Sequence, residues 1–324
     1  MAKHSPKRLR PTAAASRTLV ACALLVATLV AGEALAACNL TVSSIASTVW
    51  TGGRGRGYEV YDSLRRTQLV GFRLTSNKDC PFYLTIAPTV TPGDGSGDLS
   101  GPGGTLGYEL YKDASGSVRL KPVGTATESE VYSGIVQKGG SGLALQFVLV
   151  LPPEQVVAPG TYIGEIEFVA YEGTFGAGVV RDRRKVAVTA SVPSVVEISF
   201  TGGGSFDPTY NTYALNFGNL KTGDRRTVGL KARGNGGYRL RLGSQNGGRL
   251  RHVDPGDSSV AAYGLTVDGA TVDLTGGPAD VATNSDLVPA TGDLHLLEFS
   301  VGNLAGASSG DYKDVLDVTV LTLR

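Results

Sequence analysis

The chain has 324 residues and a formal net charge of +1, since 30 lysines and arginines nearly balance 29 aspartates and glutamates. The charges are scattered rather than gathered in blocks, which argues against a nucleic-acid-binding surface. Its 45 glycines and 15 prolines separate short alternating segments rich in valine, threonine and tyrosine. This pattern predicts an all-β protein built from β-sandwiches.

Residues 1–36 carry the pattern of a secretory signal peptide. Basic residues precede the uncharged apolar run 18–32, and Ala34-Leu35-Ala36 supplies a small-residue cleavage site, so we expect cleavage after Ala36. The apolar run is too short to span a membrane comfortably. We therefore expect an exported protein.

Two cysteines, Cys38 and Cys80, follow the predicted cleavage site. In an exported chain such a pair predicts a disulfide, which would close a loop of about 40 residues and stabilise by roughly 3 to 4 kcal/mol. An alternative is that Leu35-Ala36-Ala37-Cys38 is a lipoprotein signal and that Cys38 is acylated. The charged Glu33 and the second cysteine favour the disulfide.

Four sequence landmarks recur in the same order in the two halves of the chain. This internal repeat predicts two homologous domains, residues 37–193 and 194–324. The matching pairs are 70–77 with 228–235, 82–86 with 238–242, 106–113 with 262–268, and 160–162 with 310–312.

The segment 184–192 lies between the two copies. Its apolar residues alternate with polar ones, as in a strand with one buried face, and they are Val186, Val188, Ala190 and Val192. Pro193 then ends regular pairing. We predict that this strand completes the first domain, with Val186 and Val188 the most buried because β-branched residues fill an apolar groove well.

The second copy has no such strand after its last alternating segment, 315–324. A sandwich that lacks its final strand exposes unpaired backbone groups and an apolar cleft. We expect this segment to be an acceptor edge strand, with Leu316, Val318, Val320 and Leu321 at the edge.

The first copy resembles the spore coat protein U-like domain of archaic chaperone-usher pilus subunits. The resemblance lies in Cys38, 80–84, 106–113, 152–155 and 159–162. The second copy looks like a pilin domain of the same class, and its matching segments are 215–220, 246–250 and 310–316. Together these segments span nearly all of the chain beyond the predicted signal peptide.

The resemblance implies immunoglobulin-like, pilin-type sandwiches that lack their last strand. It implies that a periplasmic chaperone fills the gap first, and that an N-terminal strand from a neighbouring subunit replaces it at the outer-membrane usher. Cleavage after Ala36 would leave no room for a donor extension before Cys38, which places the subunit at the pilus tip on the bacterial surface. Strand 184–192 is then a donor strand acting in cis.

A tip position suggests adhesion, with a surface or glycan receptor that the sequence does not identify. Candidate contact residues are Trp50, Arg54, Arg56 and Tyr58, because large rings and arginines are good contact groups. The alternative is that Trp50 packs in the core. A glycine-rich loop at 91–107 is a second candidate.

The sequence gives little support for catalysis, cofactor binding or a metal site. His252 and His295 lack metal-ligand spacing, and the G-x-S-x-G string at 306–310 lacks the strand-turn-helix setting of a nucleophile elbow. We therefore expect that this protein is not an enzyme. The alternatives to a tip subunit are a shaft or adaptor pilin, and a free-standing secreted or lipid-anchored carbohydrate-binding protein.

Overall fold

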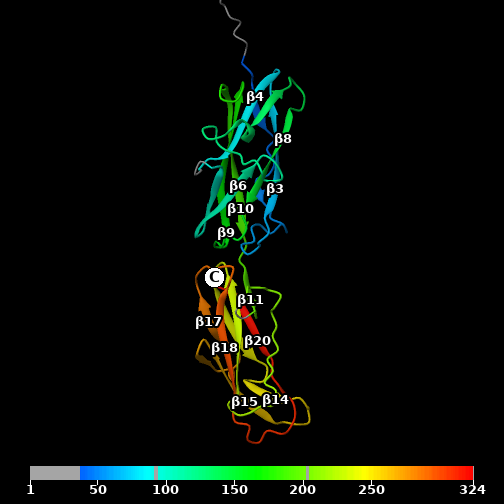
Figure 1. Cartoon of the computed structure of the whole chain (residues 1–324), viewed down its shortest axis with the longest axis vertical. Coiled ribbons are helices and arrows are strands. Elements are labelled where there is room, and N and C mark those ends of the chain that lie inside the picture. The colour runs from blue at the N-terminus through cyan, green and yellow to red at the C-terminus, as the bar shows by residue number, and fades with distance from the viewer. Residues whose placement is uncertain (1–36, 91–93, 202–203, 324) are drawn as a thin grey trace, which may run out of the picture. The chain divides into compact units, whose positions relative to one another are not determined.

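The computed structural model describes residues 37–90, 94–201 and 204–323, so the predicted signal peptide lies outside the described residues. These residues form β-strands and one short 3-10 helix, η1 (Glu128–Glu130), which confirms the all-β class (Figure 1). No helix in the described part of the chain has the length and hydropathy needed to cross a bilayer.

Two groups of strands follow each other along the chain. We call residues 38–192 the N-terminal copy and residues 196–323 the C-terminal copy. The strands of the N-terminal copy are β1 (Thr41–Ser43), β2 (Val49–Trp50), β3 (Arg66–Thr75), β4 (Cys80–Pro88), β5 (Ser96–Gly101), β6 (Gly104–Tyr111), β7 (Tyr132–Val136), β8 (Leu143–Leu151), β9 (Gly160–Glu172) and β10 (Val179–Val192).

The C-terminal copy starts after Pro193. Its strands are β11 (Val196–Ser199), β12 (Arg225–Gly234), β13 (Tyr238–Ser244), β14 (Arg249–His252), β15 (Val260–Val267), β16 (Ala270–Val272), β17 (Ala279–Asn284), β18 (Asp293–Val301), β19 (Tyr312–Lys313) and β20 (Leu316–Thr322). No described strand of one copy pairs with a strand of the other.

Each copy has two layers. In the N-terminal copy one layer has the order β1-β3-β8-β6-β5 and the other the order β7-β4-β9-β10-β2, and the pair Ser100–Ile163 joins them. In the C-terminal copy the corresponding orders are β11-β12-β18-β15-β14-β19 and β17-β13-β20. The layers correspond, except that β10 and β2 have no counterpart among the described strands of the C-terminal copy, and β16 and β19 have none among those of the N-terminal copy.

The residue register supports the repeat. Ile86 lies opposite Phe168 in β4–β9, and Leu242 lies opposite Val318 in β13–β20. Both pairs fall at the positions that the matched sequence landmarks predict. Each copy also has its own apolar core, one formed by residues up to Val192 and the other by residues from Val196 onward.

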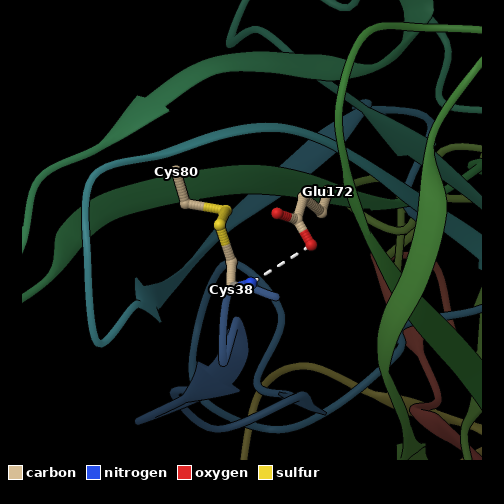
Figure 2. Close-up of side chains that lie close together, drawn as sticks. All are labelled: Cys38, Cys80 and Glu172. Carbon is tan, nitrogen blue, oxygen red and sulfur yellow. Dashed lines mark hydrogen bonds between the residues drawn. A yellow bond between two sulfur atoms is a disulfide. The ribbon is translucent and has the colours of Figure 1, made fainter. Parts of the chain in front are cut away.

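The predicted disulfide between Cys38 and Cys80 is confirmed, and both cysteines are buried (Figure 2). Because acylation of Cys38 would use the same sulfur atom, the disulfide is incompatible with the lipoprotein alternative. The Glu172 carboxylate lies beside the bridge, where it accepts a hydrogen bond from the Cys38 backbone N–H at 3.2 Å and another from Arg181 at 2.6 Å. The side chains of Cys38, Cys80 and Glu172 lie close enough together to resemble a metal-binding group, but the two sulfur atoms are already bonded to each other.

Candidate functional site

The difference between the two copies lies beside β9 and its counterpart β20. In the N-terminal copy, β10 runs antiparallel along β9 and begins at Val179, earlier than the predicted segment 184–192 (Figure 1). On its other edge β10 pairs in parallel with β2, where Ala190 lies opposite Trp50. Because β9 also pairs with β4, it has a neighbouring strand on both edges.

Val188, Ala190 and Val192 are 0 %, 0 % and 2 % exposed, whereas Val186 is only partly buried. The prediction that Val186 is among the most buried residues of this strand is therefore wrong. Val188 lies opposite Gly164 and Ala190 lies opposite Tyr162. The large ring across from Ala190 fills the space, so a small residue is buried there as completely as a β-branched one.

Strand β20 pairs with β13 on one edge and, among the described residues, with no strand on the other. Leu316, Val318 and Val320 are half-buried and pack against the core of the C-terminal copy. Leu321 is 39 % exposed, because alternation turns it to the opposite face. Leu321 therefore lies in the edge strand, as predicted, but its side chain does not face the groove.

Hydrogen bonds at the two ends of β20 show which backbone groups face the open edge. Gln245 donates its N–H to the Val315 carbonyl at 3.0 Å, and Leu323 donates to Gly237 at 3.4 Å. Hydrogen-bonded and non-hydrogen-bonded residue pairs alternate along an antiparallel ladder. The N–H and C=O groups of Leu316, Val318 and Val320 therefore point away from β13, toward the open edge.

A groove with a volume of about 980 Å³ lies beside this edge. Its walls come from the irregular segment 213–220, from the core-facing side of β18 and β15, and from the segment 304–318. Apolar side chains of this groove include Leu215, Phe217, Val228, Tyr263, Leu297, Phe299, Leu316 and Val318. An open strand edge beside an apolar groove can take an added strand, with backbone hydrogen bonds along the edge and side chains in the groove.

Asp314 is one of the charged residues that line the groove, together with Asp311 and Lys313. The Asp314 carboxylate accepts hydrogen bonds from the hydroxyls of Tyr263 and Ser244, each at 2.6 Å. It also accepts one from the backbone N–H of Asn246 at 3.1 Å. Burial and the bond to Asp314 raise the pKa of Tyr263, so its hydroxyl stays protonated and keeps donating. Asp314 is not among the site residues predicted from the sequence, although its position is the counterpart of Gly164.

The structure separates the residues proposed as adhesive contacts. Trp50 is 3 % and Tyr58 is 4 % exposed, so both rings belong to the core, as the alternative for Trp50 predicted. The Tyr58 hydroxyl donates to the Pro152 carbonyl at 2.7 Å. Arg54 and Arg56 are exposed, and Arg54 lies 3.9 Å from Glu59. Only the two arginines remain as candidate contact groups.

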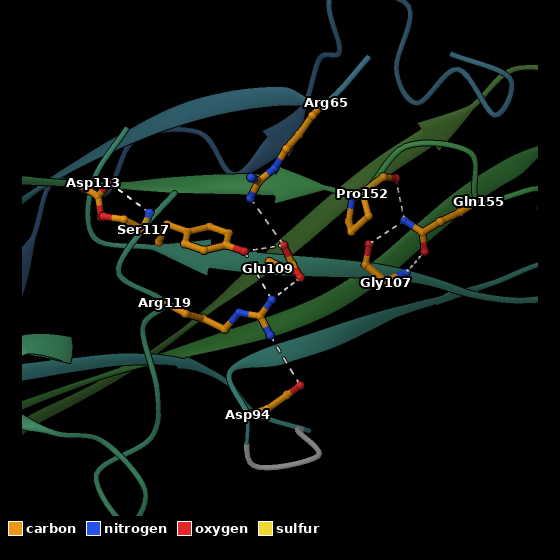
Figure 3. A network of polar contacts seen from close by, with 10 residues as sticks. Arg65, Asp94, Gly107, Glu109, Asp113, Ser117, Arg119, Pro152 and Gln155 are labelled. Atoms are coloured by element: carbon orange, nitrogen blue, oxygen red, sulfur yellow. Dashed lines mark hydrogen bonds and ion pairs between the residues drawn. The ribbon is translucent and has the colours of Figure 1, made fainter. Parts of the chain in front are cut away.

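In the segment proposed as a second contact loop, residues 91–93 lie outside the described residues, and residues 96–107 belong to a hairpin made by β5 and β6. Beside it, Glu109 bonds Arg119 and the Tyr111 hydroxyl, and it lies 3.7 Å from Arg65 (Figure 3). These groups satisfy one another, which indicates a structural network.

Gln155 pairs with the backbone of Gly107 beyond the end of β8 at Leu151. Its side-chain amide accepts a hydrogen bond from the N–H of Gly107 at 2.7 Å and donates one to the C=O of Gly107 at 3.0 Å.

The two histidines have separate partners. His295 Nδ1 lies 2.6 Å from the Asp268 carboxylate and its Nε2 lies 2.8 Å from the Tyr238 hydroxyl. His252 is in β14, where its ring packs edge-on against Tyr312. The string at 306–310 precedes β19, a strand rather than a helix, so the setting of a nucleophile elbow is absent there.

No family model matches the chain, and no curated protein matches it. Solved structures of similar shape include the CsuC-CsuE chaperone-tip adhesion subunit pre-assembly complex from archaic chaperone-usher Csu pili of Acinetobacter baumannii. That match has 14% identity and a TM-score of 0.41, and it covers 79% of this chain and 91% of that one.

Two further structures are similar. The CupB6 tip adhesin from Pseudomonas aeruginosa matches with 13% identity and a TM-score of 0.36, over 88% of this chain and 95% of its own. The CssB subunit of enterotoxigenic Escherichia coli colonization factor CS6, complemented with a donor strand from CssA, matches with 15% identity and a TM-score of 0.28, over 47% and 96%. At such low identities and TM-scores we draw no functional conclusion from these likenesses.

Proposed function

We propose that this protein is a structural and adhesive subunit of an archaic chaperone-usher pilus, assembled by donor-strand complementation. In this account β10 acts as a donor strand in cis for the N-terminal copy. The C-terminal copy accepts a strand in trans, first from a periplasmic chaperone and then, at the outer-membrane usher, from the N-terminal strand of a neighbouring pilin subunit. The protein is exported through the periplasm to the bacterial surface.

The observation that carries the proposal is the contrast between β9 and β20. On the edge where β9 pairs with β10, no strand among the described residues pairs with β20, and the groove lies beside that edge. The same contrast is visible in exposure: Phe168 of β9 is 0 % exposed, whereas its counterpart Val318 is only half-buried. A bound strand would satisfy the backbone groups of Leu316, Val318 and Val320 and cover their side chains.

We place the subunit at the tip of the pilus. Cleavage after Ala36 would leave Cys38, which is held in the disulfide, close to the mature N-terminus. Arg54 and Arg56 are exposed on the N-terminal copy and are candidate contacts for a surface or glycan receptor. N-terminal sequencing of the exported protein tests this position, and a long segment preceding Cys38 would favour a shaft or adaptor subunit.

The test of the accepting role is a fusion that supplies the missing strand. Residues 184–192 are copied after Arg324 through a flexible glycine-serine linker, which raises the effective concentration of the strand. We expect the thermal transition of the C-terminal copy to move upward by several degrees, since covering half-buried side chains adds stability. The matched control carries Val188→Asp and Ala190→Asp in the appended strand and should behave as the parent chain. An unchanged transition in the first fusion would contradict the proposal.

A further inference from the structure

One residue that lines the groove of the C-terminal copy differs in kind from its counterpart in the N-terminal copy. In the β9–β10 pair, Val188 lies opposite Gly164. A Cβ atom at Gly164 would come within 2.8 Å of the Asp98 carbonyl oxygen, so this position has no room for a side chain. The matched register of the two copies puts Asp314 at the same place in the C-terminal copy.

The Asp314 carboxylate points into the fold rather than into bulk solvent. Two hydroxyls and the N–H groups of Asn246 and Val315 donate to it, which occupies the lone pairs of both oxygens. These donors are neutral. Among the residues that the structure describes, no lysine, arginine or histidine forms an ion pair with Asp314, so these neutral donors and solvent at the open groove stabilise its charge.

A docked strand would displace that solvent. A branched apolar side chain opposite Asp314, such as Val188 provides opposite Gly164, would leave an ionised carboxylate against hydrocarbon, which is unfavourable. A cationic side chain at the same place would lie across from the carboxylate, within the short distance that separates directly opposed residues of an antiparallel pair. The long stem of lysine or arginine can cover apolar surface while its charged end reaches the carboxylate and the groove mouth.

We propose that Asp314 determines which strand the C-terminal copy accepts, and that the strand of the neighbouring subunit carries a lysine or arginine opposite Asp314 between apolar residues. This inference rests on the accepting role proposed above. It also means that the groove binds a strand with the sequence of β10 more weakly, so such a strand fills it mainly when a covalent link raises the effective concentration of the strand. Asp314 thus discriminates between candidate strands.

Synthetic peptides test this directly. The first has the sequence of residues 184–192, the second carries Val188→Lys, and the third carries Thr189→Lys. The third has the same net charge as the second but puts the lysine on the opposite face of the strand. Binding to the mature full chain is measured by isothermal titration calorimetry. We expect the Val188→Lys peptide to bind up to about fivefold more tightly than either of the others, as a directly opposed pair of opposite charges allows.

Two further measurements isolate the charge of Asp314. In the parent chain, the preference for Val188→Lys should shrink as salt rises from about 0.05 to 0.5 M, because ions screen the pair. In the Asp314→Asn variant the preference should disappear. Equal binding of all three peptides, or tighter binding of the valine peptide, would overturn the role of Asp314 and leave the accepting role standing. If no peptide binds at all, both the inference and the accepting role fail.

Discussion

Val188 lies directly opposite Gly164 and is fully buried, and Asp98 and Leu99 occupy the space where a side chain at Gly164 would lie. Replacing Val188 with Asp would put a charge without a partner into the core of the N-terminal copy. We expect Val188→Asp to lower the free energy of unfolding of this copy by about 3 kcal/mol or more. Urea denaturation of the variant and of the parent chain measures the difference.

Ala187 provides the matched control because it is exposed on the other face of the same strand. Ala187→Lys puts a charge on this exposed face, opposite Glu165, and should change the stability by no more than about 0.5 kcal/mol. If the two variants lose similar stability, the account of β10 as a buried strand of the N-terminal copy is wrong.

The disulfide stabilises only one of the two copies. It links Cys38 and Cys80, which are 42 positions apart in the sequence, and the C-terminal copy contains no cysteine. The double variant Cys38→Ser, Cys80→Ser should destabilise the N-terminal copy by about 3 to 4 kcal/mol. Calorimetry should show the transition of the C-terminal copy unmoved, and a shift of both transitions by similar amounts would argue that the two copies unfold as one unit.

Buried tyrosines predict a loss of stability at alkaline pH. Burial raises the pKa of Tyr58 to about 12, so ionising this phenol costs more in the folded chain than in the unfolded one. Its contribution is complete below about pH 10, the ordinary tyrosine pKa, and is lost as the pH rises toward about 12. Burial also raises the pKa of Tyr108 and Tyr132, which adds to the loss in the same direction.

The Tyr58→Phe variant separates this contribution. It removes the hydrogen bonds with Pro152 and Gln155, which costs about 1 to 2 kcal/mol at neutral pH. It should also make stability fall less steeply between about pH 10 and 12. Urea unfolding across this range measures the slope, with the exposed Tyr210→Phe as the control. An unchanged slope would mean that Tyr58 ionises equally in both states.

Gln155 takes the place of a strand partner for Gly107, beyond the end of β8. Gln155→Ala leaves both backbone groups of Gly107 without this partner. We expect a loss of about 1 to 2 kcal/mol and faster hydrogen exchange at the Gly107 amide. Gln155→Glu keeps the acceptor and loses the donor, so it should fall between the parent and the alanine variant. If Gln155→Ala leaves the free energy of unfolding unchanged, water replaces the side-chain amide as the partner of Gly107, and the structural role of Gln155 is wrong.

The repeat made much of the fold predictable. The alternation in 82–86 and 238–242 fixes which residues face each core, and the matched spacing places Val318 where Phe168 lies. The alternation around β10 likewise gave its buried face. These features depend on local periodicity, which a single sequence records directly.

Other features depend on what lies across the fold. Ala190 is buried because Tyr162 is opposite, and Leu321 is exposed because its neighbours face the core. Trp50 lies next to β10, a strand distant from it in the sequence. The Asp314 carboxylate is held by Tyr263 and Ser244, which come from other strands. Such contacts follow from register and packing, and one sequence gives no distance between these residues.

Amide hydrogen exchange along β20 tests the central claim most directly. If the edge is open, the amides of Leu316, Val318 and Val320 exchange fast, whereas those of Asp317, Thr319 and Leu321 are protected by β13. On β9, which has neighbours on both edges, the amides of Ile166 and Phe168 should be protected as well as that of Glu167. Uniform protection along β20 in the isolated chain would contradict the account, because it would mean that the edge is already paired.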